Sequence, residues 1–148
     1  MNDDKLTESL KAHSQNVTKA RRLVFEALGA QESQTMRELI NRLSGQVDRA
    51  SVYRTIELFE KLGIVEKIQI GWKYKLELSN AFSYHHHHLT CSNCGRDVPI
   101  HENSALEQAV QTFLMAHGFV RSTHQVQIRG LCQACQAQGL DTKGLPAK

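Results

Sequence analysis

The chain has 148 residues, a hydrophobic fraction of 41% and a formal net charge of +3 at pH 7. This size allows one domain or two small ones, and no apolar run reaches the about 18 residues that predict a membrane span. The first residues are acidic and lack the apolar core of a signal peptide, so we expect a cytoplasmic protein without a membrane segment. The net charge alone is too small to indicate a nucleic-acid partner.

The first third of the chain predicts three short helices. Apolar residues at helical spacing place them at 5–13, 18–29 and 35–43. Lys19 and Arg21 lie in the first turn of the second helix, where positive charge opposes the helix dipole. A polyanion alongside this turn would explain them, and a solvated basic face would explain them equally well.

A fourth helix, predicted over 48–63, carries candidate base-reading residues. Asp48 suits its N-cap, and Gly63 suits a glycine C-cap. A helix-turn-helix protein places its base-reading side chains near the N-terminal end of such a helix, off the buried stripe. Four residues meet this description: Arg49, Ser51, Tyr53 and Arg54.

Two alternating segments, 64–70 and 73–78, predict a β-hairpin closed by a two-residue turn at Gly71-Trp72. Helices followed by a two-stranded hairpin make a winged helix. Its outer face would carry basic side chains suited to DNA phosphates, although exposed lysines on an edge strand also block aggregation. These side chains are Lys67, Lys73 and Lys75.

The second half of the chain predicts a small α/β domain. Residues 79–84 read as a linker and residues 137–148 as a disordered tail. Between them the pattern predicts strands at 86–91 and 97–100, a helix over 104–117 and a longer strand over 119–129. We therefore expect an α+β fold, with a winged helix-turn-helix domain at 1–78 and an α/β domain at 85–136.

Four consecutive histidines form the first part of the strongest chemical signal. In an extended strand, alternate side chains point to opposite faces. His86 and His88 would therefore face one way, and His85 and His87 the other. One strand can thus supply two metal sites, and the internal position of the run argues against a purification tag.

Two Cys-x-x-Cys pairs form the second part. Cys91 and Cys94 make the first pair, Cys132 and Cys135 make the second, and together they use all four cysteines. Two such pairs suit one tetrahedral Zn2+ ion. Disulfides or redox dithiols are the alternatives, and a cytoplasmic location favours metal.

Two further residues have competing explanations. His124 lies on an otherwise apolar face of the predicted strand, where a lone histidine is more often a core residue than a ligand. If His85 and His87 lie on a neighbouring strand, the two explanations become equally good. Ser104 and Glu107 have the spacing of a capping box, which would explain the glutamate without any metal.

Taken together, these motifs resemble the ferric uptake regulator (Fur) superfamily over about residues 14–136. The matching segments are Val17-Thr18 with Arg21, Ala50 to Thr55, Phe59 to Val65, the histidine run with Leu89 to Arg96, His117-Gly118-Phe119, and Gly130 to Cys135. The resemblance implies an N-terminal winged helix and a C-terminal α/β dimerisation domain. It also implies a repressor, not an enzyme, that binds palindromic operators in double-stranded DNA as a metal-loaded homodimer.

The resemblance further assigns three metal sites. It implies structural zinc on Cys91, Cys94, Cys132 and Cys135; an interdomain regulatory site of Glu77, His86 and His88; and a site in the dimerisation domain of His85, His87, Glu107 and His124. Tyr53 and Arg54 match the family's DNA-contacting pair. Asn16 stands where a minor-groove lysine is common, which leaves Lys19 as a substitute.

Departures from the family pattern concern the regulatory metal. Iron-type members often have a histidine before the third helix, where this chain has Glu32-Ser33-Gln34, so that ligand is missing or replaced by Glu32. His87 stands where many iron regulators have aspartate, and Pro99 stands near a position that is often acidic in peroxide sensors. Imidazole and carboxylate ligands suit Fe2+, Mn2+, Ni2+ or Zn2+. Zinc sensors often add a cysteine to this site, and none is left over here, so we expect an iron-responsive regulator, with a zinc-responsive one next and manganese, nickel or peroxide sensing after it.

Two other classes of protein would use similar ligands. A zinc or iron hydrolase needs an open coordination position beside a general base, and no nucleophile or base motif accompanies these histidines. A metal-storage module would not need the helix that carries Tyr53 and Arg54, nor the basic hairpin. We therefore expect a regulator of metal-homeostasis genes.

Overall fold

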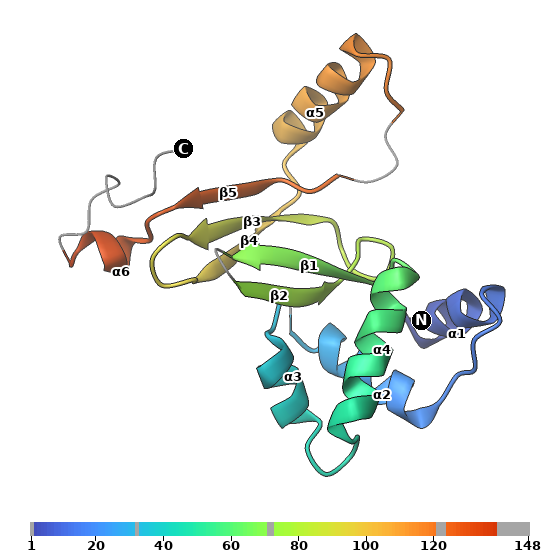
Figure 1. Cartoon of the computed structure of the whole chain (residues 1–148). Coiled ribbons are helices and arrows are strands. Elements are labelled where there is room, and N and C mark those ends of the chain that lie inside the picture. The colour runs from blue at the N-terminus through green and yellow to red at the C-terminus, as the bar shows by residue number, and fades with distance from the viewer. Residues whose placement is uncertain (1, 32, 71–72, 121–123, 139–148) are drawn as a thin grey trace. The chain divides into compact units, whose positions relative to one another are not determined.

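The computed structural model describes residues 2–31, 33–70, 73–120 and 124–138. Its contacts divide the chain into two compact units, residues 1–84 and 85–148. The first unit contains four helices and a hairpin, and the second contains a small sheet and two helices (Figure 1). Among the described residues, no helix is long and apolar enough to cross a membrane.

The four helices of the first unit occupy the predicted places. They are α1 (Asn2–Ala12), α2 (Lys19–Gly29), α3 (Met36–Arg42) and α4 (Arg49–Lys61). Helices α2, α3 and α4 each bury an apolar face in one shared core, and each fully buried leucine, isoleucine or phenylalanine contributes roughly 1.5–3 kcal/mol. This core includes Val24, Leu28, Leu39, Val52, Ile56 and Phe59, with Leu6 and Leu10 from α1.

Polar side chains set where the helices begin. Thr18 and Asp48 accept backbone hydrogen bonds at the start of α2 and α4. At α3 the hydroxyl of Thr35 accepts from the backbone N–H of Glu38 at 3.2 Å, and the Glu38 carboxylate accepts from the N–H of Thr35 at 2.7 Å. This reciprocal capping box stabilises the start of α3, a helix of only seven residues.

The predicted glycine C-cap of α4 is confirmed. Gly63 has a φ of +66°, in the left-handed region that favours glycine. The next residue, Ile64, donates its N–H to the carbonyl of Phe59 at 2.8 Å and is fully buried. This is the bonding of a Schellman motif, and it turns the chain from α4 into the hairpin.

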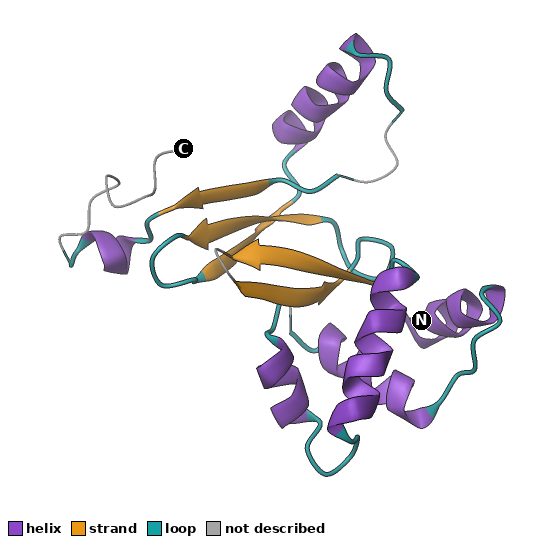
Figure 2. Cartoon of the chain, viewed as in Figure 1, coloured by secondary structure: helices purple, strands orange, loops and turns teal. Residues whose placement is uncertain are grey.

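The hairpin consists of β1 (Val65–Ile70) and β2 (Lys73–Leu78), which pair antiparallel (Figure 2). Leu76 on β2 also exchanges two backbone hydrogen bonds with Gln34, at 3.0 and 2.7 Å, so the segment before α3 lies against the hairpin. The predicted turn at 71–72 lies outside the described residues. Helices and hairpin together form a winged helix.

The segment 79–84, predicted as a linker, packs with the first unit. The hydroxyl of Ser79 donates to the carbonyl of Gly63 at 2.6 Å. Phe82 is buried, and its ring meets the edge of Phe25 at a centroid distance of 5.7 Å. An aromatic residue thus fixes part of this polar segment.

The second unit has the order β3 (His86–Cys91), β4 (Asp97–His101), α5 (Ser104–Ala116), β5 (Gln127–Gly130) and α6 (Gln133–Gln136). Its sheet has the strand order β4-β3-β5, with β4 antiparallel and β5 parallel to β3. The predicted tail at 137–148 falls almost entirely outside the described residues.

The predicted long strand over 119–129 is wrong in its first part. Residues 119–120 and 124–126 have no regular structure, residues 121–123 lie outside the described part, and only 127–130 pairs with β3. The register with β3 begins at His88 and Gln127. Upstream of it, the His124 side chain reaches Glu107 on α5 instead of continuing a strand face.

Candidate metal centres and nucleic-acid interface

The four cysteines meet at one end of the second unit. Their sulfur atoms lie within 4.8 Å of one another, with Cys91–Cys135 and Cys94–Cys132 pairs at 3.8 Å and no disulfide. A tetrahedral zinc ion with Zn–S bonds of about 2.3 Å holds its sulfur ligands about 3.8 Å apart. The four thiols therefore fit one Zn2+ ion.

Parallel pairing of β3 and β5 explains how distant cysteines come together. Cys91 ends β3 directly opposite Gly130, and the N–H of Ser92 donates to the Gly130 carbonyl at 2.8 Å. Two residues after Gly130 the chain reaches Cys132, at the start of α6. The gap of 37 residues between the two pairs is thus spanned by β4, α5 and β5.

The thiol environment favours a bound cation. The backbone N–H of Cys132 donates to the Cys91 sulfur at 3.4 Å and, with the N–H of Cys94, lowers the pKa of Cys91 to about 6. The hydrogen bond from the Asn93 amide lowers the pKa of the Cys135 thiol. Burial and the neighbouring thiols raise this pKa by more, so the net effect is an increase to about 11. Thiolates this close repel each other, and a divalent cation removes that repulsion.

The second cluster is built around one oxygen of Glu107. Its Oε1 atom lies 3.1 Å from His85 Nε2, 2.9 Å from His87 Nε2 and 3.2 Å from His124 Nε2. Burial raises the pKa of Glu107, but hydrogen bonds from the three imidazoles lower it more, to about 2. Ligands of a tetrahedral zinc with bonds of about 2.0–2.1 Å lie about 3.3–3.4 Å apart, so this donor set also fits a metal ion.

The capping-box explanation of Glu107 is wrong. Asn103 is the N-cap of α5, because its side chain accepts from the N–H groups of Ala105 and Leu106 at 3.0 and 3.2 Å. The Glu107 carboxylate is consequently available to the histidines. His124, whose role as ligand or core residue was open, lies in this cluster.

The predicted alternation of the histidines is confirmed. The rings of His86 and His88 lie together with centroids 4.8 Å apart, and those of His85 and His87 lie together at 4.7 Å. His85 precedes β3, yet its ring still joins the Glu107 cluster. His87 and His88 are both almost completely buried, on opposite faces of the sheet.

Glu77 belongs to the first unit, where it lies near the end of β2. It is directly opposite Glu66 in the hairpin register. Like charges in this position repel each other, so a cation there would be stabilising. In the region of the missing family histidine, Glu32 lies outside the described residues, and the Ser33 hydroxyl accepts from the Lys75 ammonium at 3.5 Å.

The N-terminal half of α4 presents the predicted DNA-contacting side chains. Tyr53 is 39% exposed, and the Arg49 guanidinium lies over its ring at 5.7 Å from the centroid. Arg54 is exposed and donates to the Ser51 hydroxyl at 3.1 Å. These contacts hold polar groups outward while the opposite face of α4 packs in the core.

Other predicted basic residues differ in how accessible their charges are. Lys19 and Lys73 are exposed. Arg21 donates to the backbone carbonyl of Asn16 and, at 3.2 Å, to the Gln15 side chain. Lys67 on β1 pairs with Glu60 on α4 at 2.7 Å, so its charge is partly neutralised within the first unit.

Sequence reasoning missed one residue beside the histidines. The Asp97 carboxylate lies 3.1 and 3.2 Å from Nδ1 of His88. Only the cross-strand register, which pairs Asp97 with Thr90, shows that the aspartate shares the face of His88. Alternation along a single strand cannot supply that information.

Comparison with known proteins places these features in a family. The model of the ferric uptake regulator family matches residues 12–129. A ferric uptake regulation protein of Campylobacter jejuni is 36% identical over 95 residues, which cover 64% of this chain and 59% of that protein. The peroxide operon regulator of Bacillus subtilis is 28% identical over 135 residues, covering 86% and 89% of the two chains.

A solved structure agrees with this match at the level of the fold. The Helicobacter pylori ferric uptake regulator, described as having three functional metal binding sites, superposes with a TM-score of 0.72 at 20% identity and covers 91% of both chains. The family match spans most of the sequence, and the winged helix, metal-ligand clusters and small α/β unit agree with it. The chain therefore belongs to the ferric uptake regulator family and is a metal-responsive transcriptional regulator, not an enzyme.

Proposed function

We propose that this regulator is an iron-responsive repressor that binds a palindromic operator as a homodimer and controls metal-homeostasis genes. The observation that carries the proposal is the histidine strand β3, which presents imidazoles on both faces of one sheet. The relatives named as ferric uptake regulation proteins support iron as the sensed metal.

Each ligand cluster has its own role in this proposal. Cys91, Cys94, Cys132 and Cys135 hold a structural Zn2+ ion that joins the end of β3 to α6. His85, His87, Glu107 and His124 hold a second ion inside the dimerisation domain. Glu77, His86 and His88 hold the regulatory ion, which ties the DNA-binding domain to the dimerisation domain.

The donor set supports iron over zinc at the regulatory site. All four thiols lie in the cysteine cluster, so this site is left with imidazole and carboxylate ligands. Such ligands suit Fe2+, Mn2+, Ni2+ and Zn2+ alike, so the argument against zinc is the absence of the additional cysteine that zinc sensors of the family often have. Zinc sensing is the next candidate.

Peroxide sensing is a distinct candidate because of the similarity to the B. subtilis peroxide operon regulator. This chain matches the ligand pattern of peroxide sensors less well, because Pro99 stands near a position that is often acidic in such sensors. The same purified protein tests both functions.

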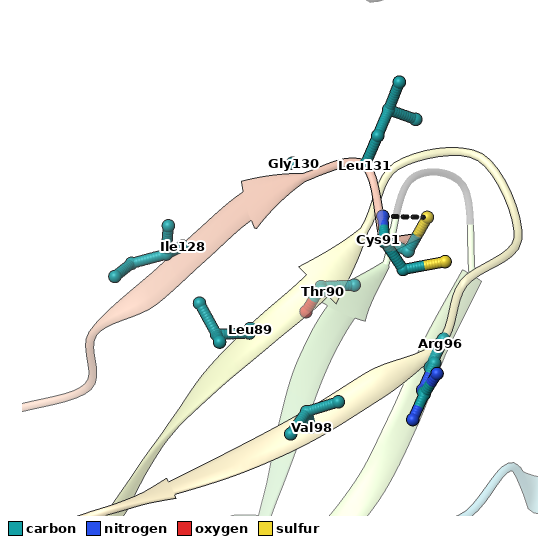
Figure 3. Close-up of a pocket in the computed structure, with 9 residues that line it drawn as sticks. Leu89, Thr90, Cys91, Arg96, Val98, Ile128, Gly130 and Leu131 are labelled. Atoms are coloured by element: carbon teal, nitrogen blue, oxygen red, sulfur yellow. Dashed lines mark hydrogen bonds between the residues drawn. The ribbon is translucent and has the colours of Figure 1, made fainter. Parts of the chain in front are cut away.

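An exposed apolar surface supports the homodimer. Leu89, Val98 and Ile128, on β3, β4 and β5, are 43%, 38% and 50% exposed and line one hollow in the second unit (Figure 3). Phe113 and Met115 on α5 are 68% and 70% exposed. Leu89 is directly opposite Val98 and Ile128 in the sheet register, and an exposed apolar patch of this kind is typical of a protein interface, which a second copy of the chain would cover.

Metal analysis and DNA-binding titrations test the proposal. Protein purified without added metal should contain about one structural Zn2+ per chain, as expected for a four-thiolate site. Operator sequences can be selected from random DNA with Fe2+-loaded protein, and affinity is then measured with chelator, Fe2+, Mn2+, Ni2+ and Zn2+. We expect Fe2+ to raise operator affinity and chelator to abolish the increase.

Other outcomes identify the alternatives. Activation by Zn2+ but not by Fe2+ would indicate a zinc regulator. Loss of Fe2+-dependent binding after brief exposure to hydrogen peroxide, with retention of Mn2+-dependent binding, would indicate a peroxide sensor. Operator binding that ignores every metal would contradict a metal-responsive repressor.

A further inference from the structure

Asp97 and His88 form a buried pair inside the second unit. The side chains are 2% and 1% exposed, and both carboxylate oxygens lie within 3.2 Å of His88 Nδ1. Burying an aspartate away from water is costly unless its oxygens accept hydrogen bonds. A pair this deeply buried therefore has a defined geometry.

The pair belongs to a polar network that crosses all three strands. Gln127 on β5 donates its amide to the Thr90 hydroxyl at 3.0 Å, and that hydroxyl donates to Asp97 at 3.3 Å. Arg129 in turn donates to the Gln127 carbonyl oxygen at 3.2 Å. These three hydrogen bonds run in one direction and end on the Asp97 carboxylate, which also faces Nδ1 of His88.

The acceptor character of Asp97 selects one tautomer of His88. An ionised carboxylate has no proton to donate, so a neutral His88 paired with it would carry the hydrogen on Nδ1 and the lone pair on Nε2. The residue opposite His88 in the register is Pro99, whose side chain has no polar atom. Asp97, one step along the same face of β4, supplies the carboxylate instead.

We propose that Asp97 is a positioning residue for the regulatory metal: it holds His88 with Nδ1 protonated and Nε2 ready to bind the ion. This inference rests on the proposed role of His88 as a regulatory ligand. Outer carboxylates of this kind fix the orientation of a ligating imidazole and make it a stronger ligand. Asp97 does not itself touch the metal.

The tautomer is tested first, without regulatory metal. Protein labelled with 15N-histidine, loaded only with zinc at the cysteines, is studied by long-range 1H–15N correlation at a pH where the imidazoles are neutral. Wild type should show His88 protonated at Nδ1. Asp97→Asn should show both tautomers, because an amide both donates and accepts.

The affinity for metal is tested next with Co2+. Paramagnetic shifts of the His86 ring report occupancy of this site separately from the other clusters. Asp97→Asn should bind Co2+ about 10–100-fold more weakly, with Co2+ absorption bands of unchanged shape. Glu102→Gln, at an exposed carboxylate of the same unit, should leave both tautomer and affinity unchanged.

A second pair of variants keeps the test decisive if Asp97→Asn folds poorly. Thr90→Val removes the hydroxyl that donates to Asp97, and Thr90→Ser keeps it. We expect Thr90→Val to weaken Co2+ binding in the same direction but less, and Thr90→Ser to restore it.

Three results would overturn the inference. They are a wild-type His88 protonated at Nε2, equal Co2+ affinity in wild type and Asp97→Asn, or altered band shapes that make Asp97 a direct ligand. Failure of the proposed function looks different: His86 and His88 would take up no Co2+ in wild type, whatever the tautomer.

Discussion

A single carboxylate oxygen of Glu107 faces three imidazole nitrogens, although the oxygen has only two lone pairs to accept hydrogen bonds. Each neutral imidazole can donate one hydrogen bond from Nε2, but three such bonds to one oxygen crowd three rings together. A metal ion among the same four atoms uses the imidazole lone pairs instead, with the carboxylate charge offsetting the ion. At the residue scale, we therefore propose Glu107 as the charge-balancing ligand of this cluster.

Replacement of Glu107 by glutamine tests that role. The amide keeps the size of the side chain but loses its charge, so metal bound here should dissociate more readily. We expect Glu107→Gln to retain zinc at the cysteines, to lose the second equivalent of metal and to melt at lower temperature, as measured by metal analysis and thermal unfolding. Glu102→Gln is the matched control, and equal metal content in both variants would show that Glu107 is no ligand.

Removal of one cysteine ligand should have a larger structural effect. The zinc that we propose clamps the end of β3 to α6, so Cys132→Ser should unfold the second unit or dissociate the dimer rather than merely weaken DNA binding. Zinc content, circular dichroism and sedimentation measure the three effects. A Cys132→Ser protein that remains a stable dimer without zinc would contradict the structural role.

At the scale of the element, α3 depends strongly on its cap because it is only seven residues long. Thr35→Ala removes half of the capping box and should lower the free energy of unfolding of the first unit by about 1 kcal/mol in urea titrations. Ser44→Ala, at an exposed turn, should cost much less. Similar losses in the two variants would mean that the cap contributes nothing specific.

The capping box also predicts a pH dependence. Hydrogen bonds from the Thr35 backbone and hydroxyl lower the pKa of Glu38, so the folded state favours its ionised form. The contribution of Glu38 is therefore present above its unfolded pKa and is lost as the pH falls through the lowered folded value. In Thr35→Ala this acid-dependent loss should be smaller.

Features that depend on neighbouring residues in the sequence, such as helix caps, could be predicted. Features that depend on contacts between distant segments could not. The caps at Thr18 and Asp48 and the glycine cap at Gly63 depend on neighbours within a few residues, and the structure confirms them. The strand predicted over 119–129 fails because its upstream part depends on a contact between His124 and Glu107. Asp97 was missed for the same reason, since strand register is a tertiary property.

Helix α4 and the wing should contribute differently to DNA recognition. If Arg54 reaches a base edge, Arg54→Ala should cost about 1–3 kcal/mol on the operator and relax sequence preference. If Lys73 contacts a phosphate, Lys73→Ala should weaken operator and random DNA alike and reduce the salt slope by about one. Fluorescence anisotropy over a salt series distinguishes the two, and equal losses on both DNAs for both variants would contradict the assignment.

At the scale of the whole molecule, we propose that the regulatory ion controls operator binding by favouring one arrangement of the two domains. A dimer on a palindrome needs its two recognition helices about 34–36 Å apart, or a multiple of this, on one face of the DNA. An ion that binds the DNA-competent arrangement more tightly shifts the population by that difference in affinity. An ion bound by ligands from both domains can shift their arrangement in this way. An ion bound by ligands from one domain mainly stabilises that domain.

The two faces of β3 should therefore give unequal double mutants. We expect His86→Ala with His88→Ala to yield a zinc-containing dimer that has lost metal-dependent operator binding, because the proposed link to Glu77 is gone. His85→Ala with His87→Ala should lower thermal stability and metal content but leave a metal response, because its partners Glu107 and His124 lie within the same unit. Operator affinity with and without Fe2+, measured alongside sedimentation and thermal unfolding, compares the two directly. If the first double mutant responds normally and the second is silent, the control site is the cluster around Glu107, and the roles of the two faces are reversed.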